Sequence, residues 1–512
     1  MSAGATTRAP EAADATTTTK TRPAIRSAGR VLLMGVGFGL LAQLLFFRAA
    51  PGINVLLATV ALLGAAWRVR RLDRSRGWQD VWLPVGAIAY AAFIAIRDDT
   101  VLVVTDLLVC ITLTGATMAS FGGAAVIPRP LLAIGHLAGR FIGWAALGSV
   151  WAVADVGPRS PRRQLLGPIS RVLPVLRGLV VAIPIALIFV ALFAAADAVF
   201  ANLVAEILTI DVDLDELVGR TVLAVVLGGL ATGGLAFTAA AIDVDDPPPI
   251  RHRWLGATEA TTVLLTVGAV FVVFVTLQAA YLFGGLDTVR AAGITYAEYA
   301  RRGFFELIAV AALAGGLLLA AETFITRRPA AYLGAALAFV ALTGVVLVSA
   351  VLRLRLYQEA YGWTELRFYA LAAIAWLGTG LALGVGALLA NRSRWLPHAL
   401  VVAALAVGLG VNLIGPVRFV AEQNVARLED PRQVAPFGQA GLDTAYATLL
   451  SNDAVPALVR AVPLVPRLDR AVLQRSLDAR LQTLTSEAEF LGWQSWNLSR
   501  ATAVEALRSL DR

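Results

Sequence analysis

The sequence predicts an all-α fold: a polytopic helical bundle of about 11–12 transmembrane helices with a small helical soluble domain at its C-terminal end. Of the 512 residues, 58% are apolar and only 15% are charged, and the mean hydropathy is +0.73. A typical soluble protein has about 25% charged residues and roughly 45–50% apolar ones. The apolar excess is gathered into runs of about 20 residues, which is the length that crosses a bilayer as a helix.

Three parts are expected along the chain. Residues 1–30 are rich in Thr, Ala, Ser and Pro and are typical of a disordered tail. Residues 31–415 hold the apolar runs and form the transmembrane bundle. Residues 416–512 contain no spanning run, and Pro and Gly separate their short amphipathic stretches. This last part therefore predicts a small helical domain.

Each apolar run must be a helix, because backbone groups in the hydrocarbon have no water to bind. The predicted spans are, in order, 31–47, 52–67, 81–96, 101–127, 177–196, 219–242, 259–283, 303–323, 330–352, 368–389 and 396–415. The stretch 131–153 is ambiguous, since it is long enough to cross but carries His136 and Arg140 on one helical face. A charged residue at mid-membrane costs at least about 2.5–3.5 kcal/mol.

The distribution of basic residues helps to place this stretch. If 131–153 does not cross, most arginines before residue 416 lie on the side of the N-terminus. The positive-inside rule favours that arrangement. We therefore expect eleven spans, with an internal N-terminus and an external C-terminus.

The sequence offers little for a metal or a catalytic centre. The single Cys110 excludes a disulfide framework and a cysteine-built zinc site, and the three histidines lie far apart. Asp211, Asp213 and Asp215 are spaced like the start of a calcium loop, but Glu216 stands where that loop needs glycine. No nucleotide-binding or hydrolase motif is present. We assign no catalytic, cofactor-binding or metal residue and expect no nucleic-acid partner; these features lean against an enzyme but leave that class open.

Ionisable residues within or at the ends of spans are candidates for function, because their burial is costly. Asp106 and Asp197 are two such residues, and Asp106 either pairs with Arg97 or serves a polar pathway. Two connecting segments, 296–306 and 353–367, are polar and rich in tyrosine. If the first segment is helical, its candidate residues on one face are Glu298, Arg302 and Glu306. If the second is helical, its candidate residues on one face are Arg353, Tyr357, Tyr361 and Glu365. Arg355 and Glu359 can pair beside that face, and Arg367 stands at its end.

Two interpretations of these segments stay open. Both segments fall on the same side of the membrane in the expected topology, where they would form a polar vestibule. The alternative is an interfacial aromatic belt with neutralising ion pairs.

Several motifs carry a resemblance to known proteins. They are Ala196-Asp197-Ala198-Val199-Phe200, Tyr299 through Glu306, Tyr361-Gly-Trp-Thr-Glu-Leu-Arg367, Asn424 with Arg427, Asp443 with Tyr446, Leu450-Ser-Asn-Asp-Ala-Val-Pro456 and Asn497-Leu-Ser-Arg500. Together they resemble a bacterial family of multi-spanning proteins, domain of unknown function 4173, related to 4153. The resemblance covers about residues 170–512 and departs at Trp363, where the family usually has Leu or Val. It implies an inner-membrane helical bundle with a small helical tail, and it brings no known activity or substrate.

Three classes of function fit these features. The favoured one is a structural, sensory or regulatory protein of the cell envelope, which sits in the bacterial cytoplasmic (inner) membrane and binds an envelope protein through residues 416–512. The second is a secondary transporter, with proton coupling as one option, that uses Asp106, Glu306 or Glu322 with the face at 353–367. The third is a membrane-embedded enzyme acting on lipid or polymer precursors, for which acidic residues would supply acid–base catalysis.

Overall fold

A computed structural model gives the architecture of the protein. It describes residues 25–70, 79–124, 126, 131–156, 214–240, 256–283, 304–325, 328–392, 395–430, 432, 434 and 441–510. Over these ranges the regular structure is helical and no strand is formed, which confirms the predicted all-α class. Nine of the helices in these ranges are long and apolar enough to cross a membrane, which confirms a multi-pass helical bundle.

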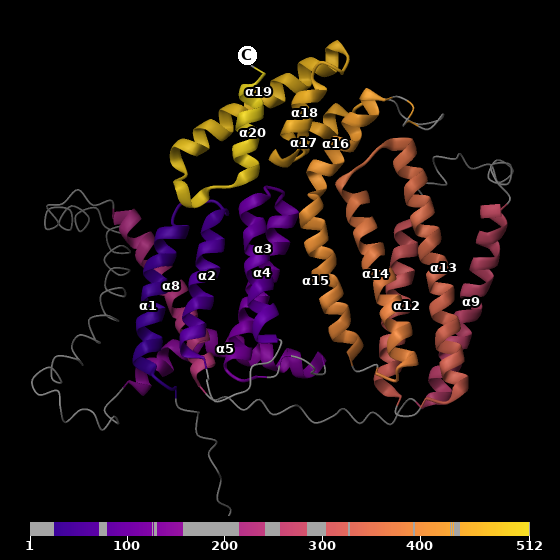
Figure 1. Ribbon diagram of the computed structural model, residues 1–512, viewed down its shortest axis with the longest axis horizontal. Coiled ribbons are helices and arrows are strands. Elements are labelled where there is room, and N and C mark those ends of the chain that lie inside the picture. Colours follow the sequence, from indigo (N-terminus) through magenta and orange to yellow (C-terminus); the bar gives the residue numbers. More distant parts are fainter. Residues whose placement is uncertain are drawn as a thin grey trace, which may run out of the picture.

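The membrane helices form two groups that stand side by side (Figure 1). The first group, the N-terminal bundle, consists of α1 (Ala28–Phe46), α2 (Ile53–Val69), α3 (Gln79–Ile96), α4 (Thr100–Phe121), α5 (Leu131–Asp155) and α8 (Leu214–Ala239). The second group, the C-terminal bundle, consists of α9 (Ala257–Phe283), α12 (Phe304–Phe324), α13 (Ala330–Tyr361), α14 (Glu365–Leu389) and α15 (Leu396–Ile414).

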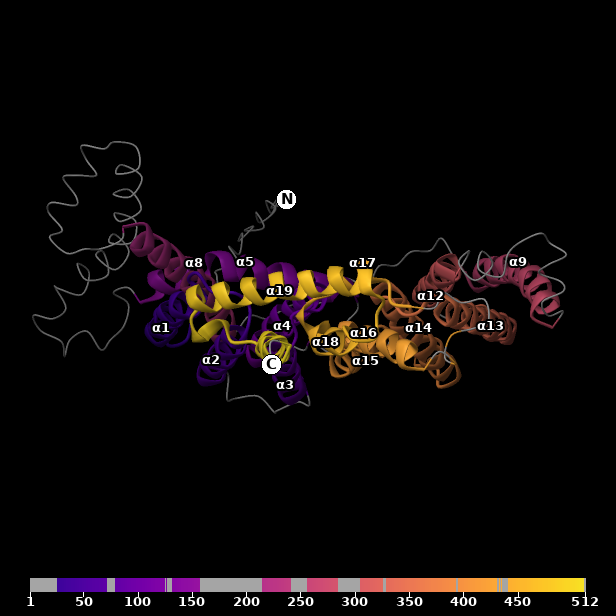
Figure 2. The same ribbon diagram turned by 90° about the horizontal axis from the view of Figure 1, so that it is seen from above.

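A third group, the C-terminal layer, lies on the end of both bundles that is remote from the start of α1 (Figure 1). It consists of α16 (Pro416–Glu429), α17 (Thr444–Leu449), a short 3₁₀ turn (Asn452–Ala454), α18 (Val455–Ala461), α19 (Arg467–Phe490), a second 3₁₀ turn (Trp493–Ser495) and α20 (Leu498–Arg508). Figure 2 shows α19 running lengthwise above the N-terminal bundle toward the near edge of the C-terminal bundle. The layer has a core of its own, centred on Leu458, Leu473 and Leu477.

The predicted spans agree with the helices wherever both can be compared. Ten of the eleven spans fall on α1–α4, α8, α9 and α12–α15. The remaining span, 177–196, lies outside the described residues. α2 and α3 are shorter apolar helices than the others, and α13 is longer than its predicted span 330–352, because it continues to Tyr361.

The ambiguous stretch 131–153 forms α5, which lies across the lower end of the N-terminal bundle (Figures 1 and 2). Its last residue, Asp155, accepts a hydrogen bond at 3.0 Å from the backbone N–H of Ile25, just before α1 begins. Both ends of α5 are therefore at the end where α1 starts. Although α5 is long and apolar enough to cross, this is the placement expected of a stretch that does not cross.

Small residues let α1 and α8 approach each other closely. A Cβ added to Gly39 of α1 would lie 2.4 Å from the carbonyl oxygen of Ala224 and 3.1 Å from the Cα of Gly228. One turn away, Gly35 faces Thr232, whose hydroxyl bonds back to the carbonyl of Gly228. Membrane helices lack a strong hydrophobic drive to associate, so close backbone packing of this kind supplies much of their attraction.

We expect Gly39→Leu to force α1 away from α8 and to destabilise the folded protein by about 1–3 kcal/mol, the usual cost of overpacking. The midpoint of thermal unfolding in detergent measures this. Gly37→Leu is the matched control on the same helix, because no atom lies within 4 Å of a Cβ added there. Equal stability of the two variants would contradict the close packing of α1 on α8.

Candidate functional site

The turn between α3 and α4 is the meeting point of the two bundles and the C-terminal layer. It consists of Arg97, Asp98 and Asp99. Asp99 is the N-cap of α4, since one carboxylate oxygen accepts a hydrogen bond from the N–H of Val101 at 3.0 Å. Its other oxygen accepts a hydrogen bond at 2.8 Å from the hydroxyl of Tyr369 on α14. Asp99 thus joins the N-terminal bundle to the C-terminal bundle.

Asp98 binds the C-terminal layer. Its carboxylate forms an ion pair with Arg500, with Nε and Oδ1 2.8 Å apart, and accepts a second hydrogen bond from the amide of Asn452. Its backbone N–H donates to the carboxylate of Asp453 at 2.9 Å. Asn497, at the N-cap of α20, donates to the carbonyls of Ile94 and Arg97. The C-terminal layer therefore binds the end of α3 both at the Asp98 side chain and at backbone carbonyls of the helix end.

Arg97 links the same turn to the end of α15. Its guanidinium donates two hydrogen bonds to the carbonyl of Asn412, at 2.6 and 3.0 Å. A cation is well placed there, because the carbonyl end of a helix carries partial negative charge. The guanidinium also covers Gly415, whose φ of +72° is left-handed and whose Cα leaves no room for a Cβ. Glycine meets both requirements.

The charge partner of Arg97 is Asp453 in the C-terminal layer. Nη1 of Arg97 lies 3.7 Å from Oδ1 of Asp453. Burial raises the pKa of the Asp453 carboxyl, while the hydrogen bond from Asp98 and the charge of Arg97 act in the opposite direction. Of the two roles expected for Asp106, the pairing with Arg97 is therefore not observed, since Arg97 is engaged with α15 and with Asp453.

A second membrane turn, between α13 and α14, is also bound by the C-terminal layer. Asn424 of α16 accepts a hydrogen bond from the N–H of Trp363 and donates one to its carbonyl, both at 2.8 Å. Arg427, one turn further on, donates to the carbonyls of Gln358 and Glu359 at the end of α13. Burial, together with the nearby charge of Arg367, lowers the pKa of Arg427.

This turn depends on Gly362 and Tyr446. Gly362 has a left-handed φ of +77°, and a Cβ there would come within 2.7 Å of the Asn424 side chain. The hydroxyl of Tyr446 accepts a hydrogen bond at 2.9 Å from the N–H of Glu365, at the start of α14. Tyr446 is itself placed by Asp443, which caps α17.

The α1–α2 turn is the third connection. The N–H of Ala50 donates to the hydroxyl of Ser495, and the N–H of Ile53 donates to the carbonyl of Trp496, both at 3.0 Å. The guanidinium of Arg500 donates to the carbonyl of Pro51. Arg500 therefore binds both the α1–α2 turn and the α3–α4 turn.

A polar cavity of about 600 Å³ lies between the α3–α4 turn, the start of α14 and the C-terminal layer. Its lining includes four acidic side chains, Asp98, Asp99, Glu365 and Glu487, and one basic side chain, Arg480. The guanidinium of Arg480 donates to backbone carbonyls of the C-terminal layer. The net charge of the cavity wall is negative, so it favours cations and cationic groups over anions.

A second cavity, of about 520 Å³, lies between the bundles and is lined mainly by residues of α4, α14 and α15. Its wall is mostly apolar, but it includes Asp106, Asn412, Tyr90 and Tyr369. Asp106 is only 1% exposed and accepts a hydrogen bond at 2.8 Å from the side-chain amide of Asn412. The hydroxyl of Tyr90 donates across the gap to the carbonyl of Leu405.

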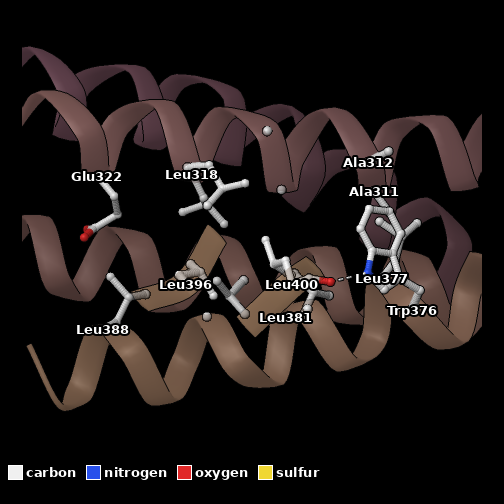
Figure 3. A pocket seen from close by; sticks show the side chains of 16 residues that line it. Ala311, Ala312, Leu318, Glu322, Trp376, Leu377, Leu381, Leu388, Leu396 and Leu400 are labelled. Carbon is white, nitrogen blue, oxygen red and sulfur yellow. Dashed lines mark hydrogen bonds between the residues drawn. The ribbon is translucent and has the colours of Figure 1, made fainter. Parts of the chain in front are cut away.

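A third cavity, of about 210 Å³, is apolar and lies within the C-terminal bundle between α12, α14 and α15 (Figure 3). Glu322 and Trp376 lie at its opposite ends. The Glu322 carboxylate is satisfied, because it pairs with Arg328 at 2.5 Å and accepts a hydrogen bond from Tyr332 at 2.8 Å. Trp376 donates to the carbonyl of Leu400. This wall offers no free charge to a solute.

The candidates predicted at 353–367 are only partly brought together. The rings of Tyr357 and Tyr361 are 5.2 Å apart, and the buried guanidinium of Arg367 lies 3.8 Å from the centre of the Tyr357 ring. Phe304, at the start of α12, also packs on Tyr357. Two helix ends thus meet here, but through aromatic packing and a cation–π contact.

The single helical face predicted over 353–367 is wrong. α13 ends at Tyr361, Gly362 turns the chain, and α14 begins at Glu365, so Glu365 does not continue the face of Arg353 and Tyr357. Arg353 is half-buried and Glu365 is half-buried on the other side of the turn. Arg355 and Glu359 are exposed, and they are not among the ion pairs formed by the described residues.

The remaining candidates lie elsewhere or cannot be placed. Glu306 is exposed in the first turn of α12. Asp197, Glu298 and Arg302 lie outside the described residues, so the facing segment at 296–306 stays a prediction. In the described ranges, no three His, Cys, Asp or Glu side chains are grouped in a way that could hold a metal ion.

Comparison with known proteins gives one family. Residues 31–461 match the family described as Domain of unknown function (DUF4153). The chain belongs to this family. The match starts near the beginning of α1 and ends in α18, so it is wider at its N-terminal side than the resemblance over 170–512, and the relation to domain 4173 stays an expectation. No curated protein and no solved structure matches the chain.

The site residues of this DUF4153 protein that sequence reasoning missed are Asp98, Asp99, Asn412, Tyr90 and Tyr369. Asn412 had a usable signal, because it is an isolated amide near the end of an apolar run. In contrast, the motifs in residues 416–512 that carried the family resemblance contain the residues that bind the turns between membrane helices. Asn424, Arg427, Tyr446, Asn497 and Arg500 all do so.

We expect Asn424→Ala to loosen the α13–α14 turn, because two hydrogen bonds worth about 0.5–1.5 kcal/mol each are lost. Amide hydrogen exchange at residues 362–365 should become at least several-fold faster. Gln423→Ala is the control on the same helix. Unchanged exchange in Asn424→Ala would show that the C-terminal layer does not hold this turn.

Proposed function

We propose that this protein is a structural or regulatory protein of the bacterial cytoplasmic membrane in which the C-terminal layer couples the two helix bundles. The observation that carries the proposal is that the layer binds connecting turns of both bundles. It holds the α1–α2 and α3–α4 turns of the N-terminal bundle and the α13–α14 turn of the C-terminal bundle. A change in the layer would therefore alter the spacing of the bundles, and the reverse also holds.

A cavity lies between the bundles, so close packing does not fix their spacing at that depth. The bonds across this cavity are polar, such as Tyr90 to the Leu405 carbonyl and Asn412 to Asp106. Discrete polar contacts of this kind can exchange between two arrangements, whereas a tightly packed core resists continuous deformation.

Exposed apolar side chains near the end of α19 support a partner protein. Phe490 is 86% exposed, and Trp493, just beyond the helix, is 62% exposed. Large apolar side chains that lie close together on a surface mark a site of interaction. We propose an envelope protein as this partner, bound through residues 416–512.

A secondary transporter that couples transport to protons is the second candidate. It is favoured by one observation, the buried carboxylate of Asp106 at the wall of a cavity between two bundles. Transporters place their coupling-ion sites near the bilayer midplane between two structural halves. The polar cavity above this site would then serve as its entrance.

The side of the C-terminal layer can be determined with single cysteines in a Cys110→Ala background. We expect Trp493→Cys to react with a membrane-impermeant maleimide in intact cells. Arg68→Cys, exposed at the opposite end of α2, should react only after permeabilisation. The reverse pattern would place the layer in the cytoplasm and overturn the proposed orientation.

The coupling role predicts that loss of the Asp98–Arg500 pair changes the spacing of the bundles. Spin labels at Arg68→Cys and Trp395→Cys, both exposed at the lower ends of the two bundles, report this spacing in lipid nanodiscs by pulsed electron resonance. We expect Arg500→Ala to broaden or shift the distance distribution. Arg508→Ala, an exposed arginine on the same helix, should leave it unchanged. If the two variants give the same distribution, the layer does not set the spacing.

A further inference from the structure

Asp106 is a carboxylic acid in an apolar setting. It lies on α4, is 1% exposed, and borders the cavity of about 520 Å³ between the bundles. An ionised carboxylate at such a position needs several donors or a cation to offset its loss of water. The structure supplies one donor, the side-chain amide of Asn412.

The orientation of the Asn412 amide is fixed by two acceptors. Its nitrogen donates to Oδ1 of Asp106 at 2.8 Å and to the carbonyl of Gly408 at 3.2 Å. An exchanged amide would place its oxygen against the Gly408 carbonyl, so the assignment follows from the network. Two buried atoms are then left without a hydrogen bond, Oδ2 of Asp106 and Oδ1 of Asn412. Both are acceptors when Asp106 is ionised.

Each titratable or charged group near Asp106 is occupied elsewhere. The Arg97 guanidinium binds the end of α15 and Asp453. The Tyr90 hydroxyl donates to Leu405, and the Tyr369 hydroxyl donates to Asp99. One turn along α4, Cys110 contacts the hydroxyl of Thr59 at 3.3 Å. Asp99, the acid that caps α4, accepts hydrogen bonds from Val101 and Tyr369.

We propose that Asp106 and Asn412 form a proton-binding site within the membrane. A proton taken from water onto Oδ2 of Asp106 turns one of the two unpartnered acceptors into a donor for the other. The acid and the amide then form a closed pair, in which Asn412 donates to Oδ1 and Oδ2 donates to Asn412. The step moves a proton only, leaves Asp106 neutral and removes the buried charge.

A route to the site leads from the polar cavity. Asp99 lines the polar cavity, and Tyr369 lines the cavity between the bundles that also contains Asp106. A hydrogen bond of 2.8 Å connects the side chains of Asp99 and Tyr369. Val101 borders both cavities. Asp99 and Tyr369 thus stand between the charged entrance and Asp106, where a carboxylate and a hydroxyl can relay a proton. This inference does not rest on the coupling role of the C-terminal layer.

A lipophilic carbodiimide tests the proposal, because it reacts with the protonated carboxyl group and leaves a stable N-acylurea. The full-length protein in nanodiscs is treated over a range of pH, and labelled peptides are located by mass spectrometry. We expect Asp106 to be labelled at neutral pH and the labelling to fall at least tenfold in alkaline buffer. Glu322 is the internal control, since it is buried but paired with Arg328, and it should stay unlabelled.

A second measurement covers failure of the reagent to reach the site. The infrared spectrum should contain the carbonyl stretch of a protonated carboxylic acid, and Asp106→Asn should remove that band. Absence of both the label and the band at neutral pH would overturn the proposal. Suppression of labelling by sodium, but not by choline, at constant pH would overturn it in favour of a sodium site.

Discussion

The structure depends on the turn between α3 and α4, where three consecutive residues each bind a different part of the chain. Arg97 holds the end of α15, Asp98 holds the C-terminal layer, and Asp99 holds α14. The Asp98–Arg500 pair is largely shielded, since the two side chains are 16% and 19% exposed. Hydrogen bonds to charged groups contribute about 1.5–3 kcal/mol each. Loss of one partner would also leave the other charge buried and unpaired.

The chemistry of the membrane explains why the joints lie at the ends of the helices. Between helices surrounded by lipid there is no large hydrophobic gain, so association relies on close packing and on hydrogen bonds. Close packing holds α1 to α8 inside the N-terminal bundle. Between the bundles a cavity takes its place, and the ion pairs and carbonyl contacts that join them are concentrated where water and the C-terminal layer begin.

The sequence could predict the helices of the bundle but not their partners. Runs such as 396–415 are helical for a local reason, the need to satisfy the backbone in lipid, and α15 indeed covers Leu396–Ile414. The prediction of one helical face over 353–367 was wrong, because an i, i+4 pattern does not account for the turn at Gly362. Gly362 has a left-handed φ, and Asn424, in another part of the chain, binds the turn at Trp363. Asp106 stood out as a buried acid, but its partner Asn412 lies 306 residues away.

The junction of α15 with α16 has a mechanical consequence. Gly415 is the single residue between Ile414 and Pro416, so the last membrane helix enters the C-terminal layer with no linker. A flexible linker would absorb a rotation of α15, whereas one residue fixed under Arg97 leaves almost no slack. The side chain of Asn412 touches Asp106 one turn before this joint. The orientations of α15 and of the C-terminal layer are therefore directly coupled. A small rotation of α15 within the membrane would be passed on to α16 and would displace the surface of the layer.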